Sequence, residues 1–358
     1  MAGMSTRVRV AVMGVGSLGK EHARIYAGLA AAGRIEFAGV YDVARDVAQR
    51  IAEKHGVQSF ASWEEAAGAA DAFSVVTPTV THFELARALL ERGRHVLVEK
   101  PMTDQAAQAA ALVQLARQRQ CVLQVGHVER FNPVFRYLQQ AATHPRFIEV
   151  HRLSSFPNRS TDIGVVLDLM IHDLDVVIAF VRAPVTSVEA VGIPVLSASE
   201  DIANARLRFA NGCVANLTAS RVSPERLRKI RVFSGGPRPS YISLDYRAQS
   251  GFIYRLASDE TPESSRWKKL LQAGSSAIVS EFAGRKIVRE PVPIEQDEPL
   301  KLELQSFVDC VARHQAPLVT GEAAQRALDL AFEITRQIQA GNRESPPLRG
   351  PDPAGTTR

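Results

Sequence analysis

The sequence predicts an α/β fold, in which an N-terminal doubly wound parallel sheet is followed by an α+β domain with a largely antiparallel open sheet. Two observations predict this fold. From residue 7 to about 127, short β-branched runs alternate with longer amphipathic segments, a pattern typical of parallel strands joined by crossover helices. After residues 131–133, a helical segment is followed by strands with no helices between them, which is typical of an antiparallel sheet.

The length of the chain favours two domains. Its 358 residues, 46% of them hydrophobic, exceed one ordinary core and exclude a disordered chain. We predict a first domain over residues 1–127 and a second over 128–340. The proline-rich tail over 341–358 is predicted to be disordered.

The elements of the first domain follow from periodicity. Apolar residues three and four apart predict the helices, and short β-branched runs predict the strands. The predicted strands are 8–13, 35–41, 72–77, 95–98 and 122–125, and the predicted helices are 18–32, 44–55, 80–92 and 104–118.

The second domain is predicted to contain a hairpin. Apolar and polar residues alternate over 204–209 and again over 213–217, on either side of the turn pair Asn211-Gly212. Residues 248–296 have little periodicity and are interpreted as a region that holds a mobile or inserted segment. Helices are predicted again at 300–312 and 322–340.

A glycine-rich turn follows the first strand, in the segment VRVAVMGVGSLG. Gly14 permits a tight turn, Gly16 leaves room for a pyrophosphate, and Gly19 lets the next helix pack closely on the strand. Backbone N–H groups at this helix start, with Ser17 and Leu18 between the glycines, favour an anion. The first domain is therefore predicted to be a Rossmann domain, although such a turn also occurs as a purely structural feature.

Asp42 closes the second strand, 23 positions after Gly19. A carboxylate near this spacing accepts the ribose hydroxyls of NAD and repels the 2'-phosphate of NADP. We therefore expect NAD as the cofactor, with NADP as the less favoured alternative because Arg45 lies three residues further on.

Two polar segments follow later strands of the parallel sheet. Thr77, Pro78 and His82 follow the third strand, and Glu99 and Lys100 follow the fourth. The carboxyl ends of parallel strands meet at one edge, where the ligand of such a sheet binds. We predict that these residues contact the cofactor and that Lys100 also contacts the substrate. The alternative is an ordinary loop with a solvated lysine.

A second polar group is the pattern Asp168-x-x-x-His172-x-x-Asp175 within an apolar helix. Spacings of four and three place these side chains on one helix face. His172 is the candidate general base, with Lys100 as the alternative acceptor of the proton, and Asp168 is expected to hold the His172 ring. A buried structural histidine is the alternative. No metal is predicted, because no cysteine or second nearby histidine completes a ligand set.

Several arginines are candidate ligands for a substrate phosphate. Arg130 lies in the segment that joins the domains, and Arg152 and Arg159 precede the His172 helix; each is equally compatible with a structural or surface role. Cations are densest from Arg221 to Arg231, which is interpreted as a solvated sheet edge or a site for a phosphorylated ligand.

Composition restricts the partners. The net charge of +5 arises from scattered arginines rather than one basic run, so no nucleic acid is expected. No apolar stretch approaches the roughly 20 residues of a membrane helix, and the first residues lack a signal peptide's apolar region, so no membrane and a cytoplasmic location are expected. The three cysteines are widely spaced and are predicted to be free thiols.

The chain resembles the Gfo/Idh/MocA oxidoreductases of sugars and cyclitols from residue 8 to about 340. The matching segments are GVGSLG, TPTVTH, HVLVEKP, the Asp168-x-x-x-His172-x-x-Asp175 pattern and PLVTGEAAQRAL. The resemblance implies catalytic roles for Lys100, Asp168 and His172. Met170 departs from the family pattern, which commonly has glycine there.

The segments VGHVERFNPVF and DIGVVLDLMIHDLDVV resemble the branch of the family that oxidises the 3-hydroxyl of UDP-N-acetylglucosamine. This implies a 3-keto sugar that an aminotransferase converts for lipid A. Alternatives are a dehydrogenase or reductase of another nucleotide sugar, a free sugar or a cyclitol, and an NAD-binding regulator without catalysis. A sheet covered on one face leaves the other free for a second subunit, so a homodimer or homotetramer is expected.

Overall fold

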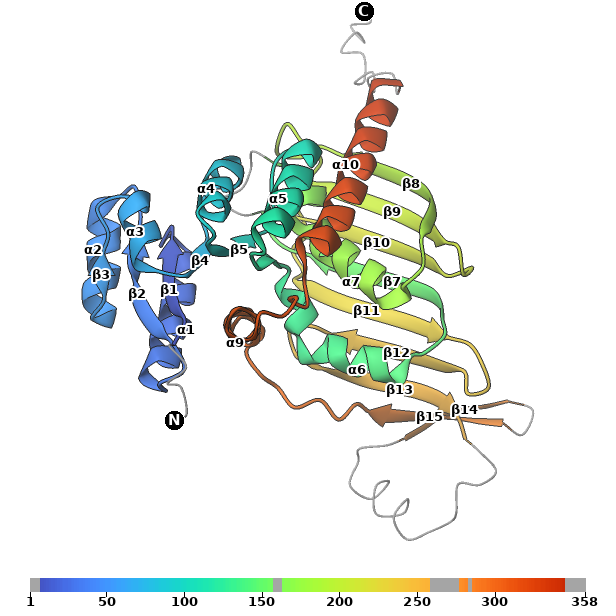
Figure 1. Ribbon diagram of the computed structural model, residues 1–358. Helices are drawn as coiled ribbons and strands as arrows, with labels where there is room; N and C mark the ends of the chain where they lie inside the picture. The colour runs from blue at the N-terminus through green and yellow to red at the C-terminus, as the bar shows by residue number, and fades with distance from the viewer. Residues whose placement is uncertain (1–6, 157–162, 258–276, 283–284, 345–358) are drawn as a thin grey trace, which may run out of the picture.

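The computed structural model describes residues 7–156, 163–257, 277–282 and 285–344 (Figure 1). Two separate sheets organise these residues: a six-stranded sheet and a nine-stranded sheet. The first is entirely parallel, and the second is almost entirely antiparallel. The predicted fold class is confirmed.

The first sheet has the strand order β3-β2-β1-β4-β5-β6, which is the order of a Rossmann fold. Strands β1, β4 and β5 lie inside the sheet and are nearly continuous buried runs, as expected where helices cover both faces. The short strand β3 and helix α3 were not predicted from periodicity. The strands are β1 Arg9–Met13, β2 Glu36–Tyr41, β3 Gln58–Ser59, β4 Ala72–Val75, β5 His95–Glu99 and β6 Leu123–Gly126, and the helices are α1 Gly19–Ala31, α2 Arg45–His55, α3 Trp63–Ala69, α4 Thr79–Glu91 and α5 Ala106–Arg119.

The second sheet has the order β14-β15-β13-β12-β11-β7-β10-β9-β8, with one parallel pair, β7 with β10. The predicted hairpin is confirmed: β9 and β10 pair antiparallel across Asn211-Gly212, where Gly212 has φ of 80°. The strands are β7 Pro145–Leu153, β8 Val185–Ile193, β9 Ile202–Phe209, β10 Val214–Ser220, β11 Leu227–Ser234, β12 Ser240–Asp245, β13 Ser250–Leu256, β14 Ala277–Phe282 and β15 Arg285–Pro291.

Three of these strands, β13, β14 and β15, lie within residues 248–296. Cross-strand pairing orders these strands despite their weak periodicity, whereas residues 258–276, between β13 and β14, lie outside the described residues, so the mobile or inserted segment stays a prediction.

Helices cover one face of the second sheet (Figure 1). Helix α6 begins with Pro133 at its first turn and with Asn132 as its cap, whose Oδ1 accepts a hydrogen bond of 3.1 Å from the Val134 N–H. The helical elements are η1 Val128–Phe131, a 3-10 turn; α6 Pro133–Ala141; η2 Val166–Met170, a π-helical turn; α7 Ile171–Val181; α9 Pro299–Arg313; and α10 Gly321–Glu344.

The last two helices connect the two sheets. Helix α9 packs on α1, and its Leu304 and Phe307 are fully buried in the same core as Val12 of β1. Helix α10 contacts α5 and α7. The domain bounds 1–127 and 128–340 stay a prediction, since residues after 298 also complete the core of the first sheet. Helix α10 continues to Glu344, so residues 341–344 are helical, whereas the rest of the predicted disordered tail lies outside the described residues.

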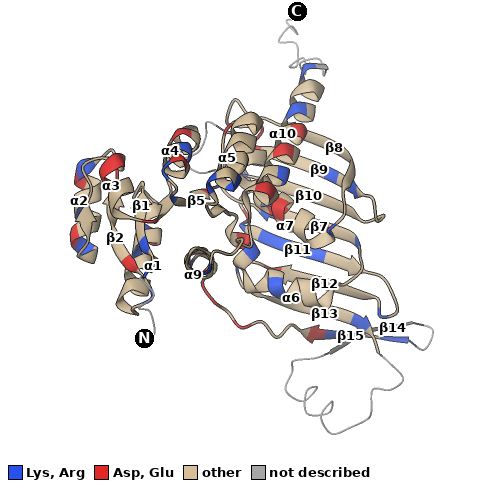
Figure 2. Ribbon diagram, viewed as in Figure 1, with Lys and Arg blue, Asp and Glu red and all other residues tan. Residues whose placement is uncertain are grey.

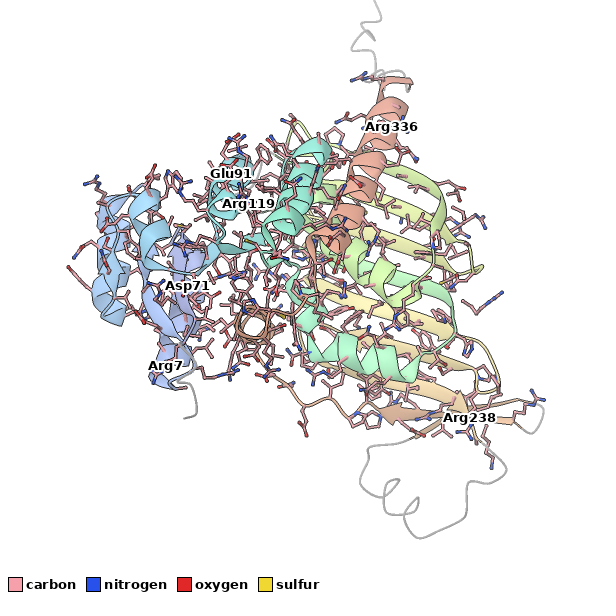
Figure 3. All side chains as sticks on the ribbon, viewed as in Figure 1. Arg7, Asp71, Glu91, Arg119, Arg238 and Arg336 are labelled. Carbon is pink, nitrogen blue, oxygen red and sulfur yellow. The ribbon has the colours of Figure 1, made fainter. Side chains whose placement is uncertain are left out.

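Charged side chains such as Glu91, Arg119 and Arg336 lie on the outside of the molecule (Figure 3). None of the three cysteines forms a disulfide. Over the described residues, every helix is too short or too polar to span a membrane.

Candidate active site

The glycine turn has the geometry that a dinucleotide requires. Gly14 has φ of 86°, and a side chain there would meet the Val76 carbonyl. A Cβ on Gly19 would overlap the Gly14 carbonyl oxygen, so the start of α1 is tightly packed. A Cβ on Gly16 would instead meet no atom within 4 Å. The backbone at Gly16 is therefore open to an approaching phosphate.

A cavity of about 920 Å³ opens beside this turn. Its lining combines the glycine turn with the ends of β2 and β4 and includes Gly14, Gly16, Ser17, Leu18, Asp42, Thr77 and Pro78. Asp42 is fixed here, because its Oδ2 and Oδ1 accept hydrogen bonds of 2.8 and 2.9 Å from the Val15 and Ala44 N–H groups. Trp63 of α3 also lines the cavity, but no periodicity pointed to this residue, because α3 was not predicted. The shape and lining fit a dinucleotide.

The other predicted cofactor residues lie along the rim. The ring nitrogens of His82 lie 3.0 and 2.8 Å from the carbonyl oxygens of Pro101 and Thr77, so this side chain joins the ends of β4 and β5. Glu99 is buried, and its Oε1 accepts a 3.2 Å hydrogen bond from Nε2 of His22 on α1. The contacts of these residues with the cofactor stay predictions.

Lys100 brings the two halves of the site together. Its Nζ donates hydrogen bonds to the backbone oxygen of Asp168, at 2.6 Å, and to Asp168 Oδ1, at 3.3 Å. The two residues are 68 positions apart, one at the end of β5 and the other in η2. Two of the three residues implied by the family resemblance thus meet, and the third, His172, lies four positions after Asp168 in the first turn of α7.

The segment that carries Asp168 is a π-helical turn, after which α7 begins at Ile171. Such turns occur frequently at functional sites. Asp168 pairs with Lys100 and has no hydrogen bond to His172. Neither ring nitrogen of His172 has a hydrogen-bond partner within the described residues, and its Nδ1 is buried. Asp168 therefore orients the lysine in this structure, rather than the imidazole ring that it was expected to hold.

The surroundings of His172 favour its neutral form. Burial, followed by the positive charges of Lys100 and Arg152, holds the pKa of the imidazole well below 6.5. The His127 ring lies edge-on to it, with 6.3 Å between ring centroids. A neutral imidazole with no bonding partner is free to accept a proton from a substrate hydroxyl.

The predicted phosphate-binding arginines have internal partners. Arg130 Nη1 lies 3.3 Å from Asp175 Oδ1, and both side chains are buried. Arg152 donates four hydrogen bonds of 2.8 to 3.1 Å to Glu129 and Asp173. Arg159 lies outside the described residues.

Arg221 also has internal hydrogen-bond partners. It is fully buried and donates to Asp201 Oδ1, the Ile163 carbonyl and Ser197 Oγ. Arg228, in contrast, was noted only as a member of the dense cation group, and its side chain is 53% exposed.

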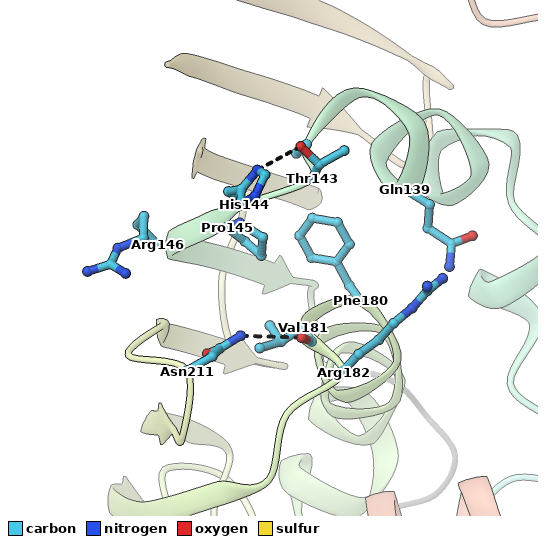
Figure 4. Close-up of a pocket in the computed structure, with 10 residues that line it drawn as sticks. Gln139, Thr143, His144, Pro145, Arg146, Phe180, Val181, Arg182 and Asn211 are labelled. Atoms are coloured by element: carbon cyan, nitrogen blue, oxygen red, sulfur yellow. Dashed lines mark hydrogen bonds between the residues drawn. The ribbon is translucent and has the colours of Figure 1, made fainter. Parts of the chain in front are cut away.

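A second cavity, of about 440 Å³, lies where α6 and α7 end and includes His144, Arg146, Phe180, Arg182 and Asn211 (Figure 4). None of the predicted site residues lines it. Across the described residues, no group of three or more His, Cys, Asp or Glu side chains is placed to hold a metal ion.

Comparison with known proteins shows the family of the chain. A family model for Gfo/Idh/MocA oxidoreductases with an NAD-binding Rossmann fold matches residues 8–127, and one for the Gfo/Idh/MocA C-terminal domain matches residues 105–234. The chain is 34% identical over 335 residues to UDP-N-acetylglucosamine 3-dehydrogenase from Acidithiobacillus ferrooxidans, covering 93% of this chain and 98% of that protein.

A solved structure of that enzyme superposes with a TM-score of 0.80 over the same shares of the two chains. A second relative, scyllo-inositol 2-dehydrogenase (NAD(+)) from Bacillus subtilis, is 26% identical over 367 residues, which cover 94% of this chain and 96% of the relative. The protein therefore belongs to the Gfo/Idh/MocA family and is an NAD-dependent oxidoreductase.

Proposed function

We propose that the protein oxidises the 3-hydroxyl of UDP-N-acetylglucosamine with NAD and produces a 3-keto sugar. The observation that carries the chemistry is the 3.3 Å contact of Lys100 Nζ with Asp168 Oδ1, which brings a cation from the nucleotide-binding sheet to the helix that holds His172. The similarity to UDP-N-acetylglucosamine 3-dehydrogenase supports the choice of substrate.

His172, Lys100 and Asp168 each have a different role in removing the hydroxyl proton. His172 accepts the proton, since its lowered pKa keeps the ring neutral. Lys100 donates a hydrogen bond to the same oxygen and stabilises the negative charge that develops there. Asp168 holds the lysine in position through a contact that joins the two sheets.

The cofactor lies along the glycine turn and Asp42 in this proposal. When bound, NAD supplies the acceptor for the hydride that leaves the carbinol carbon. Asp42 receives the ribose hydroxyls, and the open backbone at Gly16 receives the pyrophosphate. The rim residues Thr77 and His82 border the far end of this path.

The product suggests the next reaction. A 3-keto sugar is a substrate for an aminotransferase, and the family branch described above implies that the resulting diamino sugar enters lipid A. The proposal includes the cytoplasmic location predicted from the sequence. The competing function is oxidation of a cyclitol, which the similarity to scyllo-inositol 2-dehydrogenase favours.

Turnover separates these functions. The purified protein is incubated with NAD and either UDP-N-acetylglucosamine or myo-inositol, and NADH absorbance is followed. A 2-oxoacid acceptor or a coupled aminotransferase is included, because an unfavourable ketone equilibrium hides turnover. We expect NADH with the nucleotide sugar. Turnover of myo-inositol alone would refute the proposal in favour of the cyclitol.

Variants test the assigned residues. We expect His172→Ala and Lys100→Ala to bind NAD normally and to lose about 10²-fold or more in kcat. Arg119→Ala, on the exposed end of α5, is the control and should keep full activity. Full activity in both site variants would remove the assignment.

We further propose a homodimer through the uncovered face of the second sheet. An aromatic row crosses four strands on that face, with ring centroids 5.6, 4.6 and 5.1 Å apart along Phe147, Phe233, Tyr241 and Tyr254. Phe233 is 40% exposed, and an exposed aromatic patch is typical of an interface. Phe233→Glu should shift the mass in light scattering from dimer to monomer. An unchanged dimer would exclude this face, and a monomeric wild-type protein would exclude the dimer.

A further inference from the structure

Arg228 lies on β11, on the strand face that also carries the buried Ile230 and Val232 and is covered by helices. Its cross-strand neighbour on β7 is Arg152. Figure 2 shows the resulting basic stretch of β11. We propose that Arg228, assisted by Arg247, binds the diphosphate of the nucleotide-sugar substrate. This inference rests on the proposed function and names the group that recognises the nucleotide part.

Arg228 is the cation near the catalytic residues whose charge is accessible to a substrate phosphate. Three cations are tied to the catalytic residues by contacts: Lys100, Arg152, whose partner Asp173 follows His172 in the chain, and Arg228, the cross-strand neighbour of Arg152. Lys100 is bonded to Asp168, and Arg152 is enclosed by two carboxylates. Arg228 has a 53% exposed side chain and is the cation of this group that a ligand can reach.

The charge of Arg228 is poorly neutralised. Its Nη1 lies 3.8 Å from Glu129 Oε1, an oxygen that already accepts two hydrogen bonds from Arg152. Burial and then repulsion from Arg152 lower the pKa of this guanidinium, and Arg247 adds to the repulsion. An anion placed between Arg228 and Arg247 would relieve that repulsion.

Arg247 is exposed, and its side chain has no hydrogen-bond or ion-pair partner among the described residues. Its position is fixed by the backbone, where its N–H donates a 2.9 Å hydrogen bond to Asp245 Oδ1. Two guanidinium groups match the two phosphates of a diphosphate, because each forms paired hydrogen bonds to phosphate oxygens.

The location also fits the substrate. The diphosphate of a nucleotide sugar is attached to C1, two ring positions from the C3 hydroxyl. Arg228 is the cross-strand neighbour of Arg152, whose guanidinium bonds Asp173 beside His172, so it lies on the same face of the second sheet as the catalytic helix. A cyclitol or free sugar carries no phosphate that would use these arginines.

The first test is kinetic and uses Arg228→Gln, Arg228→Lys and the control Arg226→Gln. Arg226 is exposed and lies just before β11. We expect Arg228→Gln to raise KM for UDP-N-acetylglucosamine by about 10- to 100-fold, the loss of charged hydrogen bonds, with a smaller change in kcat. Arg228→Lys should recover part of the loss, and Arg226→Gln should match the wild type. An unchanged KM in Arg228→Gln would overturn the inference.

The second test is independent of turnover. Binding of UDP to the wild type and to each variant is measured by calorimetry, with melting temperatures recorded to confirm folding. If UDP-N-acetylglucosamine is not oxidised but UDP binds the wild type and not Arg228→Gln, the proposed function fails and the phosphate site stands. If UDP binds all four proteins equally, or does not bind the wild type, the phosphate site fails whatever the activity shows.

Discussion

Replacing Arg152 with methionine distinguishes a structural ion cluster from a substrate ligand. The guanidinium is buried and donates four hydrogen bonds to Glu129 and Asp173. Its charge offsets two carboxylates that are themselves buried. Removing one partner of such a cluster leaves uncompensated charge in the interior, which costs about 3–5 kcal/mol of the free energy of unfolding.

The melting temperature reports this cost. In a unit of 150–250 residues each kcal/mol corresponds to about 2–4 °C, so we expect Arg152→Met to melt roughly 6–20 °C below the wild type. The control is Arg50→Met, which removes an exposed guanidinium 3.2 Å from Asp46 on α2 and should cost no more than about 1 kcal/mol. A wild-type melting temperature in Arg152→Met, together with a raised KM for the sugar, would refute the structural interpretation.

Three further predictions concern the cofactor turn, a buried acid and the base. Gly16→Ala should fold normally, because its Cβ meets no protein atom, yet weaken NAD binding by about tenfold or more in calorimetry. Gly19→Ala should instead lower the melting temperature, since its Cβ overlaps the Gly14 carbonyl. Burial, then repulsion from acidic neighbours, raises the pKa of Glu303 well above 4.5, so the stability it contributes is complete below pH 4.5 and is lost as pH rises through the folded-state value. In urea unfolding, the free energy of unfolding of Glu303→Gln should increase relative to that of the wild type as pH rises above 4.5. A difference between the two proteins that does not change with pH would contradict this. The midpoint of the acid limb of the kcat/KM profile should lie below pH 6.5, because His172 works as a neutral base with a lowered pKa. A midpoint above pH 6.5 would contradict that role.

The first sheet and its glycine turn were predictable because their signals are local. Short β-branched runs that alternate with amphipathic segments indicate the strands of such a sheet, and the spacing of Gly14, Gly16 and Gly19 is a property of one turn. The same holds for the β9–β10 hairpin, whose turn pair and alternation lie within about a dozen residues.

Ion-pair partners were not predictable, because they depend on packing between distant segments. Lys100 and Asp168 are 68 positions apart, and Arg152 lies more than 20 positions from each of its carboxylates. The sequence shows an arginine near the site and cannot show that Glu129 and Asp173 enclose it. This is why Arg152 was an individual candidate for a substrate ligand, whereas Arg228 was included only as one cation of the dense group from Arg221 to Arg231.

The acids around His172 show how tertiary contacts change the chemistry of a motif. On an isolated helix, Asp168 and Asp175 would lie one turn from the histidine and raise its basicity. In the folded protein each binds a cation instead, Lys100 and Arg130. Burial, together with the positive charges around it, therefore leaves the imidazole with a lowered pKa. A weaker base suffices here because the lysine stabilises the oxygen anion as it forms, which lowers the proton affinity of the hydroxyl itself. Loss of the Lys100 charge would then affect the reaction in two opposite ways: His172 would become more basic, but the hydroxyl would become a poorer acid. Since the hydroxyl is otherwise far too weak an acid to give up its proton, the second effect outweighs the first.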